Sequence, residues 1–216
     1  RSTPSNSSAA SDVYKRQICK VNAIFAPKGK QPVFMQQQCN GCGACVLACP
    51  KQAISWSGKE IGYIYSGKGR GIEFLSGELK IKEPVSEFVV GTLKEALEKE
   101  RGKYDFIVID TAAGTHCDVS SALRGCGFAL AVTEPTPLGE HDLELIMQLL
   151  NELRIEFEIV LNRSDIGKPD LIEKIAGKYG KGIAAKIPYK KGIMVAYSKG
   201  IPVKSREIEK LKEMVE

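Results

Sequence analysis

Four cysteines lie close together in the stretch CNGCGACVLACP, and their spacing gives this chain its clearest chemistry. The order C-x-x-C-x-x-C-x-x-x-C-P is formed by Cys39, Cys42, Cys45 and Cys49. Each two-residue gap lets a tight turn aim neighbouring thiolates at one centre. Gly41 and Gly43 leave the backbone free to bring its N–H groups toward sulfur. Soft thiolates in such a compact run favour an iron–sulfur cluster.

Two other uses of these cysteines remain open. A structural zinc site usually takes its ligands from two separated C-x-x-C pairs, whereas here all four cysteines form one compact run. A disulfide would suit a secreted chain, and nothing in this sequence indicates secretion. Both alternatives are weaker than the cluster interpretation.

A fifth cysteine, Cys19, belongs to a partial copy of the same pattern. ICKVNAI, residues 18–24, and ACPKQAI, residues 48–54, share Cys-x-x-x-Ala-Ile. This repeat resembles the bacterial two-cluster ferredoxins, in which three cysteines of one run take their fourth ligand from the last cysteine of the other run. The resemblance implies one complete four-iron site whose ligands are Cys19, Cys39, Cys42 and Cys45. Cys49 would then serve a second cluster, two being expected in the natural protein.

Two alternatives for Cys19 stay open. The cluster could be local, held by the four cysteines of the run, or Cys19 could be a small buried side chain without a ligand role. Residues 12–17, DVYKRQ, are what a transposon-end sequencing adaptor encodes, and a Ser-rich stretch without periodicity precedes them. We therefore interpret residues 1–17 as a non-native leader and expect the natural protein to extend further upstream.

The remainder of the chain changes from short β-prone runs to alternating strands and helices. We divide it into a partial ferredoxin-type domain over 18–57, a β-rich connection over 58–84 and a nucleotide-binding domain over 85–216. Apolar runs predict strands at 104–110, 127–134, 157–163 and 182–188. Amphipathic patterns predict helices at 86–100, 138–153, 168–180 and 205–216. This alternation predicts the α/β class, with a partial doubly wound parallel sheet beside a small α+β ferredoxin-like insertion.

Short motifs follow the predicted strands, where ligands of such sheets bind. They are VIDTAAG, VTEPTPLGEHDL, LNR and IPY followed by AYSKGIPV. Their order and spacing resemble the MinD/ParA-type P-loop ATPases, and the cysteine run before VIDTAAG resembles the members that carry an inserted two-cluster ferredoxin domain. The resemblance covers essentially all of residues 18–216.

The resemblance implies roles for four residues at these strand ends. Asp110 would be the catalytic Walker-B-like acid that holds Mg²⁺ through water, and Gly114 would sense the terminal phosphate of ATP. Asn162 would bind adenine, with the backbone around Pro188 flanking the base. Taken alone, an acid after a strand could equally cap the next helix.

The phosphate-binding loop of that family has no counterpart in this sequence. No stretch reads G-x-x-x-x-G-K-[ST], and GKGRG, residues 67–71, lies between two β-prone runs and predicts a hairpin turn. We therefore expect this chain to bind ATP poorly by itself. The parent would couple ATP to electron transfer. The alternatives are an iron–sulfur scaffold or carrier and a non-enzymatic ferredoxin-type binding module.

Composition limits the partners and the compartment. Lys and Arg number 31 against 26 for Asp and Glu, and this mild excess is scattered, so it indicates neither nucleic acid nor a membrane surface. No apolar run approaches the length of a membrane span. Seven cysteines with a cluster motif indicate a reducing cytoplasm. Expected partners are ATP, a redox protein or iron–sulfur acceptor, and a second copy in a homodimer.

Overall fold

The computed structural model describes residues 2–4, 18–25, 32–50 and 52–214. It forms two compact units, Arg1–Ile109 and Asp110–Glu216. Apart from residues 2–4, the stretch interpreted as a non-native leader lies outside the described residues. Strand β1 (Ser2–Pro4) pairs antiparallel with β4 (Trp56–Gly58).

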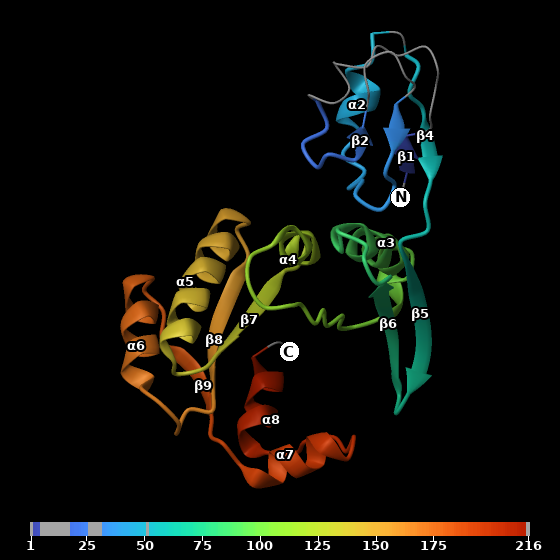
Figure 1. Ribbon diagram of the computed structural model, residues 1–216. Coiled ribbons are helices and arrows are strands. Elements are labelled where there is room, and N and C mark those ends of the chain that lie inside the picture. The colour runs from blue at the N-terminus through green and yellow to red at the C-terminus, as the bar shows by residue number, and fades with distance from the viewer. Residues whose placement is uncertain (1, 5–17, 26–31, 51, 215–216) are drawn as a thin grey trace. The chain divides into compact units, whose positions relative to one another are not determined.

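The cysteine-rich part of the first unit is built from very short elements (Figure 1). Strand β2 (Ile24–Phe25) pairs antiparallel with β3 (Val33–Phe34), and α2 (Ala44–Leu47) follows the first cysteines of the run. Cys49 and Ile54 form a small buried core, against which Phe34, Cys45, Val46 and Ala53 pack.

The β-rich connection forms a long hairpin with a helix packed against it. Strands β5 (Gly62–Gly69) and β6 (Ile72–Leu79) pair antiparallel over eight residues each. Arg70 and Gly71 join them with φ angles of 53° and 79°, as a two-residue primed turn requires. The prediction that GKGRG is a hairpin turn is therefore confirmed.

Helix α3 (Glu87–Glu98) contacts both strands of this hairpin. The helix fits closely because the two strand positions that lie against Val89, Gly62 and Gly77, are glycines. A Cβ placed on Gly77 would lie 2.5 Å from a methyl carbon of Val89, and one on Gly62 would lie 3.1 Å from the other. A 3₁₀ turn, η1 (Arg101–Lys103), follows the helix.

The second unit contains the predicted parallel sheet, in the order β7-β8-β9. Its strands are β7 (Phe128–Thr133), β8 (Glu156–Asn162) and β9 (Ile183–Ile187). The connecting helices are α5 (Pro137–Glu152) and α6 (Pro169–Lys178), which contact each other. The strands at 127–134, 157–163 and 182–188 and the α/β class are confirmed.

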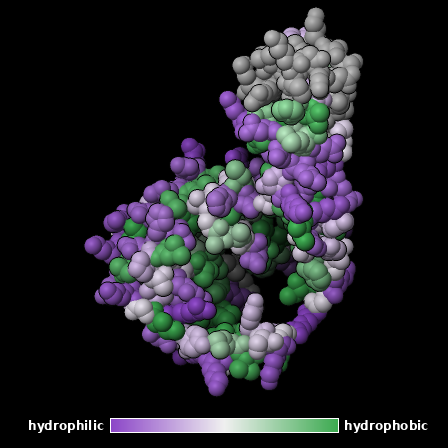
Figure 2. Space-filling view, viewed as in Figure 1, coloured by the Kyte–Doolittle hydropathy of each residue, from purple (hydrophilic) through white to green (hydrophobic). Residues whose placement is uncertain are grey.

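The core of this unit joins the sheet to its helices. Side chains from α4 (Cys117–Leu123), α5, α6 and β8 form it, among them Val119, Leu143, Met147, Ile159 and Ile172. Figure 2 shows mostly hydrophilic side chains on the outer surface over α5 and α6, as expected for amphipathic helices.

The helix ends follow the signals in the sequence. Thr136 accepts a hydrogen bond from the backbone N–H of Gly139 at 3.0 Å and caps α5, with Pro137 at its first position. Gly180, at φ 66°, ends the turn after α6. The chain closes with α7 (Lys191–Ser198) and α8 (Arg206–Glu213). None of the helices described in this structure is both long enough and apolar enough to cross a membrane.

The predicted strand over 104–110 is wrong. In the described part of the chain these residues pair with no strand, and Phe106 and Val108 are 55% and 90% exposed. An apolar run creates a tendency toward burial, but a strand forms only where a neighbouring strand supplies hydrogen-bond partners.

Candidate functional site

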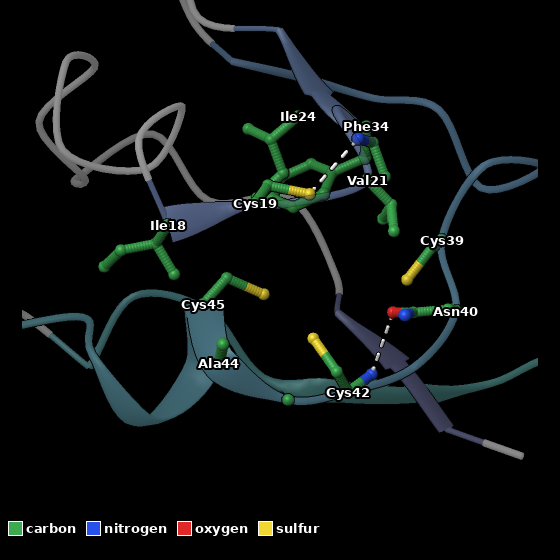
Figure 3. A pocket seen from close by; sticks show the side chains of 12 residues that line it. Ile18, Cys19, Val21, Ile24, Phe34, Cys39, Asn40, Cys42, Ala44 and Cys45 are labelled. Atoms are coloured by element: carbon green, nitrogen blue, oxygen red, sulfur yellow. Dashed lines mark hydrogen bonds between the residues drawn. The ribbon is translucent and has the colours of Figure 1, made fainter. Parts of the chain in front are cut away.

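Four thiols line one pocket in the first unit. Cys19, Cys39, Cys42 and Cys45 reach it from the turn before β2, the loop after β3 and helix α2, and Figure 3 shows their sulfur atoms pointing toward a common centre. The remaining lining is largely apolar and includes Ile18, Val21, Ile24 and Phe34. The fold therefore collects soft ligands among apolar side chains, with Cys42 itself exposed.

Two left-handed glycines shape the loop that carries three of these thiols. Gly41 has φ 71° and Gly43 has φ 77°, a region that disfavours other residues. Gly43 also accepts the first backbone bonds of α2, from Val46 at 2.9 Å and Leu47 at 3.1 Å. Cys42 immediately precedes this glycine, and Cys45 is the second residue of the helix.

Backbone N–H groups donate to the cysteine sulfurs. Ala23 donates to Sγ of Cys19 at 3.1 Å, and Gly41 donates to Sγ of Cys39 at 3.4 Å. Around iron–sulfur clusters, hydrogen bonds of this kind help to set the reduction potential. The backbone therefore supports these sulfurs as metal ligands.

The repeat seen in the sequence is also a repeat in structure. Ala53 donates to Sγ of Cys49 at 3.3 Å, the counterpart of the bond from Ala23 to Cys19. The residue before each alanine is left-handed, with φ 53° at Asn22 and 48° at Gln52. Both copies therefore present a cysteine sulfur from the same local turn.

The fifth cysteine lies apart from the four-thiol pocket. Cys49 is 7% exposed and packs beside Ile54 in the small core. The pocket instead contains Cys19. The pocket therefore brings together the four predicted ligands, Cys19, Cys39, Cys42 and Cys45, and their role as ligands stays a prediction.

Burial raises the pKa of the Cys45 thiol above its ordinary value, and the neighbouring Cys39 and Cys42 raise it further. Thiolate charges placed close together repel one another unless a cation lies between them. Metal binding to such a site must therefore release protons.

A zinc ion and a four-iron cluster require different spacings of the cysteine sulfurs. Within the described residues, no group of three or more His, Cys, Asp or Glu side chains is placed to hold a single ion. A zinc ion needs all its sulfurs at about 2.3 Å from one centre. In a four-iron cluster each thiolate binds a different iron, so the sulfurs stand further apart.

A second candidate site, for the predicted nucleotide, lies at the edge of the sheet where β8 and β9 end. Asn162 pairs in register with Ile187, so that Asn162 and Pro188 come to neighbouring positions. Two further bonds join the loops beyond them: Ser164 N–H donates to the Ile187 carbonyl at 3.0 Å, and Tyr189 N–H donates to Oδ1 of Asp165 at 2.6 Å. The sequence-based prediction misses Asp165, although an acid just after a strand is a usable signal.

The other two predicted nucleotide residues lie before α4. Asp110 is exposed, and Gly114 has φ 89°. Over the described residues, neither forms a hydrogen bond or ion pair with Asn162 or Pro188. The structure thus brings Asn162 and Pro188 together. The roles of all four predicted residues stay predictions.

Comparison with known proteins gives one family match in the cysteine-rich part and several similar proteins over longer stretches. Residues 32–55 match the family described as the 4Fe-4S binding domain. An uncharacterized protein of Methanocaldococcus jannaschii, MJ0579, is 36% identical over 184 residues, which are 85% of this chain and 62% of that protein. The uncharacterized ATP-binding protein MJ0685 of the same organism is 28% identical over 51% of this chain and 45% of its own length. This chain thus spans less than two thirds of either relative.

Solved structures show a similar fold. The cell division ATPase MinD of Pyrococcus furiosus matches with a TM-score of 0.53 and 23% identity, over 70% of this chain and 69% of that one. The septum site-determining protein MinD of Pyrococcus horikoshii, complexed with Mg-ADP, matches with a TM-score of 0.50 and 24% identity. This match covers 64% of this chain and 58% of that one. These likenesses show that the chain has an α/β fold. More particularly, it joins a 4Fe–4S binding domain to a MinD-like fold, and the predicted resemblance is confirmed.

Proposed function

We propose that this chain is part of an iron–sulfur ATPase of the MinD type that couples ATP binding and hydrolysis to electron transfer. The observation that carries the proposal is the four-thiol pocket, which lies in a 4Fe–4S binding domain of a chain with a MinD-like fold. The activity, a redox partner and a homodimeric assembly are parts of this proposal.

In this proposal Cys19, Cys39, Cys42 and Cys45 hold one four-iron cluster, which would supply one-electron chemistry when bound. The N–H groups of Ala23 and Gly41 stabilise the charge on two of the ligand sulfurs. Ile24 and Phe34 keep water away from the inner side of the pocket. A low-dielectric surrounding strengthens these hydrogen bonds.

The nucleotide part rests on the MinD-like fold and on relatives whose descriptions name ATP binding or Mg-ADP. Asp110 would hold Mg²⁺ through water, and the N–H of Gly114 would approach the terminal phosphate. Asn162 would donate to the adenine ring beside Pro188. No G-x-x-x-x-G-K-[ST] stretch occurs in this sequence, so the proposal names no residue of this chain for a phosphate-binding loop.

Anaerobic reconstitution with iron and sulfide tests the proposal. We expect about four iron and four sulfide atoms per chain, with a paramagnetic signal after reduction by one electron. A chain that takes up one zinc ion and no iron would contradict it. Mixing the loaded protein with an apo-ferredoxin separates electron transfer from cluster delivery: the cluster stays in place if it is redox-active and moves to the acceptor if it is cargo.

A further inference from the structure

The single tryptophan of the chain packs on the loop that carries the cysteines. A Cβ placed on Gly43 would come within 2.5 and 2.6 Å of two carbons of the Trp56 indole. The ring and the glycine backbone are therefore in direct contact. Position 43 must be glycine for two reasons, its φ of 77° and the space taken by the ring.

Gly43 sits where a small displacement would move two of the proposed ligands. Cys42 is its neighbour in the chain, and Cys45 lies on the helix whose first turn Gly43 begins. The carbonyl of Gly43 accepts the bonds from Val46 and Leu47 that start this helix. Whatever holds Gly43 in place also fixes the spacing of these two thiols.

Helix α2 is too weak to hold that spacing without help. It has four residues, none of its described side chains is buried, and Leu47 is 86% exposed. Helices this short are unstable unless tertiary contacts support them. On one side Cys45 and Val46 pack against the core formed by Cys49 and Ile54. On another side the indole of Trp56 packs on Gly43.

Trp56 can act as a support because its own backbone is anchored. It follows the buried Ile54 by two residues, and Ile54 belongs to the small core on which Cys45 and Val46 also pack. Trp56 as a whole is 48% exposed, and two carbons of its ring pack on the turn. Aromatic side chains in such a position exclude water from the backbone that they cover.

We propose that Trp56 is a positioning residue of the cluster site: its ring fixes the Gly43 turn, and thereby the spacing of Cys42 and Cys45, and limits the access of water to that turn. The inference rests on the proposed cluster ligands. The reduced cluster with four thiolates carries more negative charge than the oxidised one, so water admitted at this turn would stabilise the reduced form and raise the reduction potential.

The test compares Trp56→Ala, Trp56→Phe and Leu47→Ala with the unsubstituted chain after anaerobic loading with iron and sulfide. We measure the loss of cluster absorbance in the presence of a chelator and the reduction potential by voltammetry. Trp56→Ala should lose the cluster about tenfold faster, the rate equivalent of one aromatic contact, and its potential should rise. Trp56→Phe should give a rate of cluster loss and a potential between those of Trp56→Ala and the unsubstituted chain. Leu47→Ala, a change at an exposed position of helix α2, should give the same rate and potential as the unsubstituted chain.

A measurement without metal separates the contact from the cluster. Because Trp56 is the only tryptophan, its fluorescence reports on this ring alone. Gly43→Ala should shift the emission of the apo protein to longer wavelength as the methyl group displaces the ring into water. An unchanged emission, or equal cluster lifetimes and potentials in Trp56→Ala and the unsubstituted chain, would overturn the inference. Failure of the unsubstituted chain to bind iron would instead overturn the proposed function and, with it, this inference.

Discussion

The backbone N–H of Ala23 donates to Sγ of Cys19 at 3.1 Å, four residues back along the chain. The same bond recurs between Ala53 and Cys49 at 3.3 Å. The two copies of Cys-x-x-x-Ala-Ile thus fold alike, although only the first directs its sulfur into the four-thiol pocket. This pair of equivalent turns provides matched controls for the cluster site.

The left-handed residue in each turn gives the first prediction. Asn22 has φ 53°, which asparagine and glycine tolerate and a β-branched residue does not. We expect Asn22→Val to destabilise the turn by about 1–2 kcal/mol and to shorten the lifetime of the cluster, and Asn22→Gly to preserve it. Gln52→Val introduces the same strain beside Cys49 and should leave the cluster spectrum unchanged. Equal cluster lifetimes in Asn22→Val and Asn22→Gly would argue against a role for this turn.

Nucleotide hydrolysis gives the second prediction. We expect this chain alone to release phosphate from ATP no faster than buffer, because it lacks the lysine and the hydroxyl of a phosphate-binding loop. In a protein that adds such a loop to this chain, Asp110→Asn should reduce turnover by weakening the placement of Mg²⁺. The cluster absorbance should stay unchanged in that variant. Bleaching of the cluster by Asp110→Asn would show that the two sites are not separable.

Packing in the second unit gives the third prediction. The side chain of Met147 is 0% exposed and lies in the core between the sheet and its helices. Met147→Ala should lower the free energy of unfolding of this unit by about 2–5 kcal/mol, through lost burial and the cavity left behind. Leu138→Ala, on the same helix at 69% exposure, should change it by less than about 0.5 kcal/mol. Urea unfolding followed by circular dichroism measures both, and similar losses would contradict the described core.

Titration of one tyrosine gives the fourth prediction. The hydroxyl of Tyr104 donates to Oε2 of Glu73 at 2.5 Å, and this bond raises the pKa of Tyr104 to about 12. Its stabilising effect is therefore complete below the ordinary tyrosine pKa of about 10 and disappears as the pH rises through about 12. Phenolate absorbance should show a late step that is missing in Tyr104→Phe. In Glu73→Gln that step should move toward pH 10, and an unmoved step would assign the shift to another cause.

Local patterns in the sequence predict much of this fold. Arg70-Gly71 marks the hairpin turn, Thr136-Pro137 marks the start of α5, and the apolar runs at 127–134 and 157–163 form β7 and β8. Each of these depends on residues that are neighbours in the chain. The repeated Cys-x-x-x-Ala-Ile likewise indicates, from the spacing of a few residues, that Cys19 and Cys49 lie in similar local turns.

Features that depend on distant residues are not predictable in this way. The exposed run at 104–110 resembles a buried strand because its composition is apolar, yet whether it pairs depends on the chain beside it. The contact of Trp56 with Gly43 joins residues with no pattern in common. The bond from Tyr189 to Asp165 joins two loops that only the parallel sheet brings together.

The central claim is that Cys19, and not Cys49, completes the four-thiol site, and iron content in two alanine variants tests it most directly. After anaerobic reconstitution, Cys19→Ala should lose or strongly destabilise the cluster, because it removes a ligand from the pocket. Cys49→Ala should keep about four iron atoms, since that sulfur lies in the small core beside Ile54. Cys126→Ala, in the other unit, controls for general effects of losing a thiol. The reverse pattern, with the cluster intact in Cys19→Ala and lost in Cys49→Ala, would contradict this account.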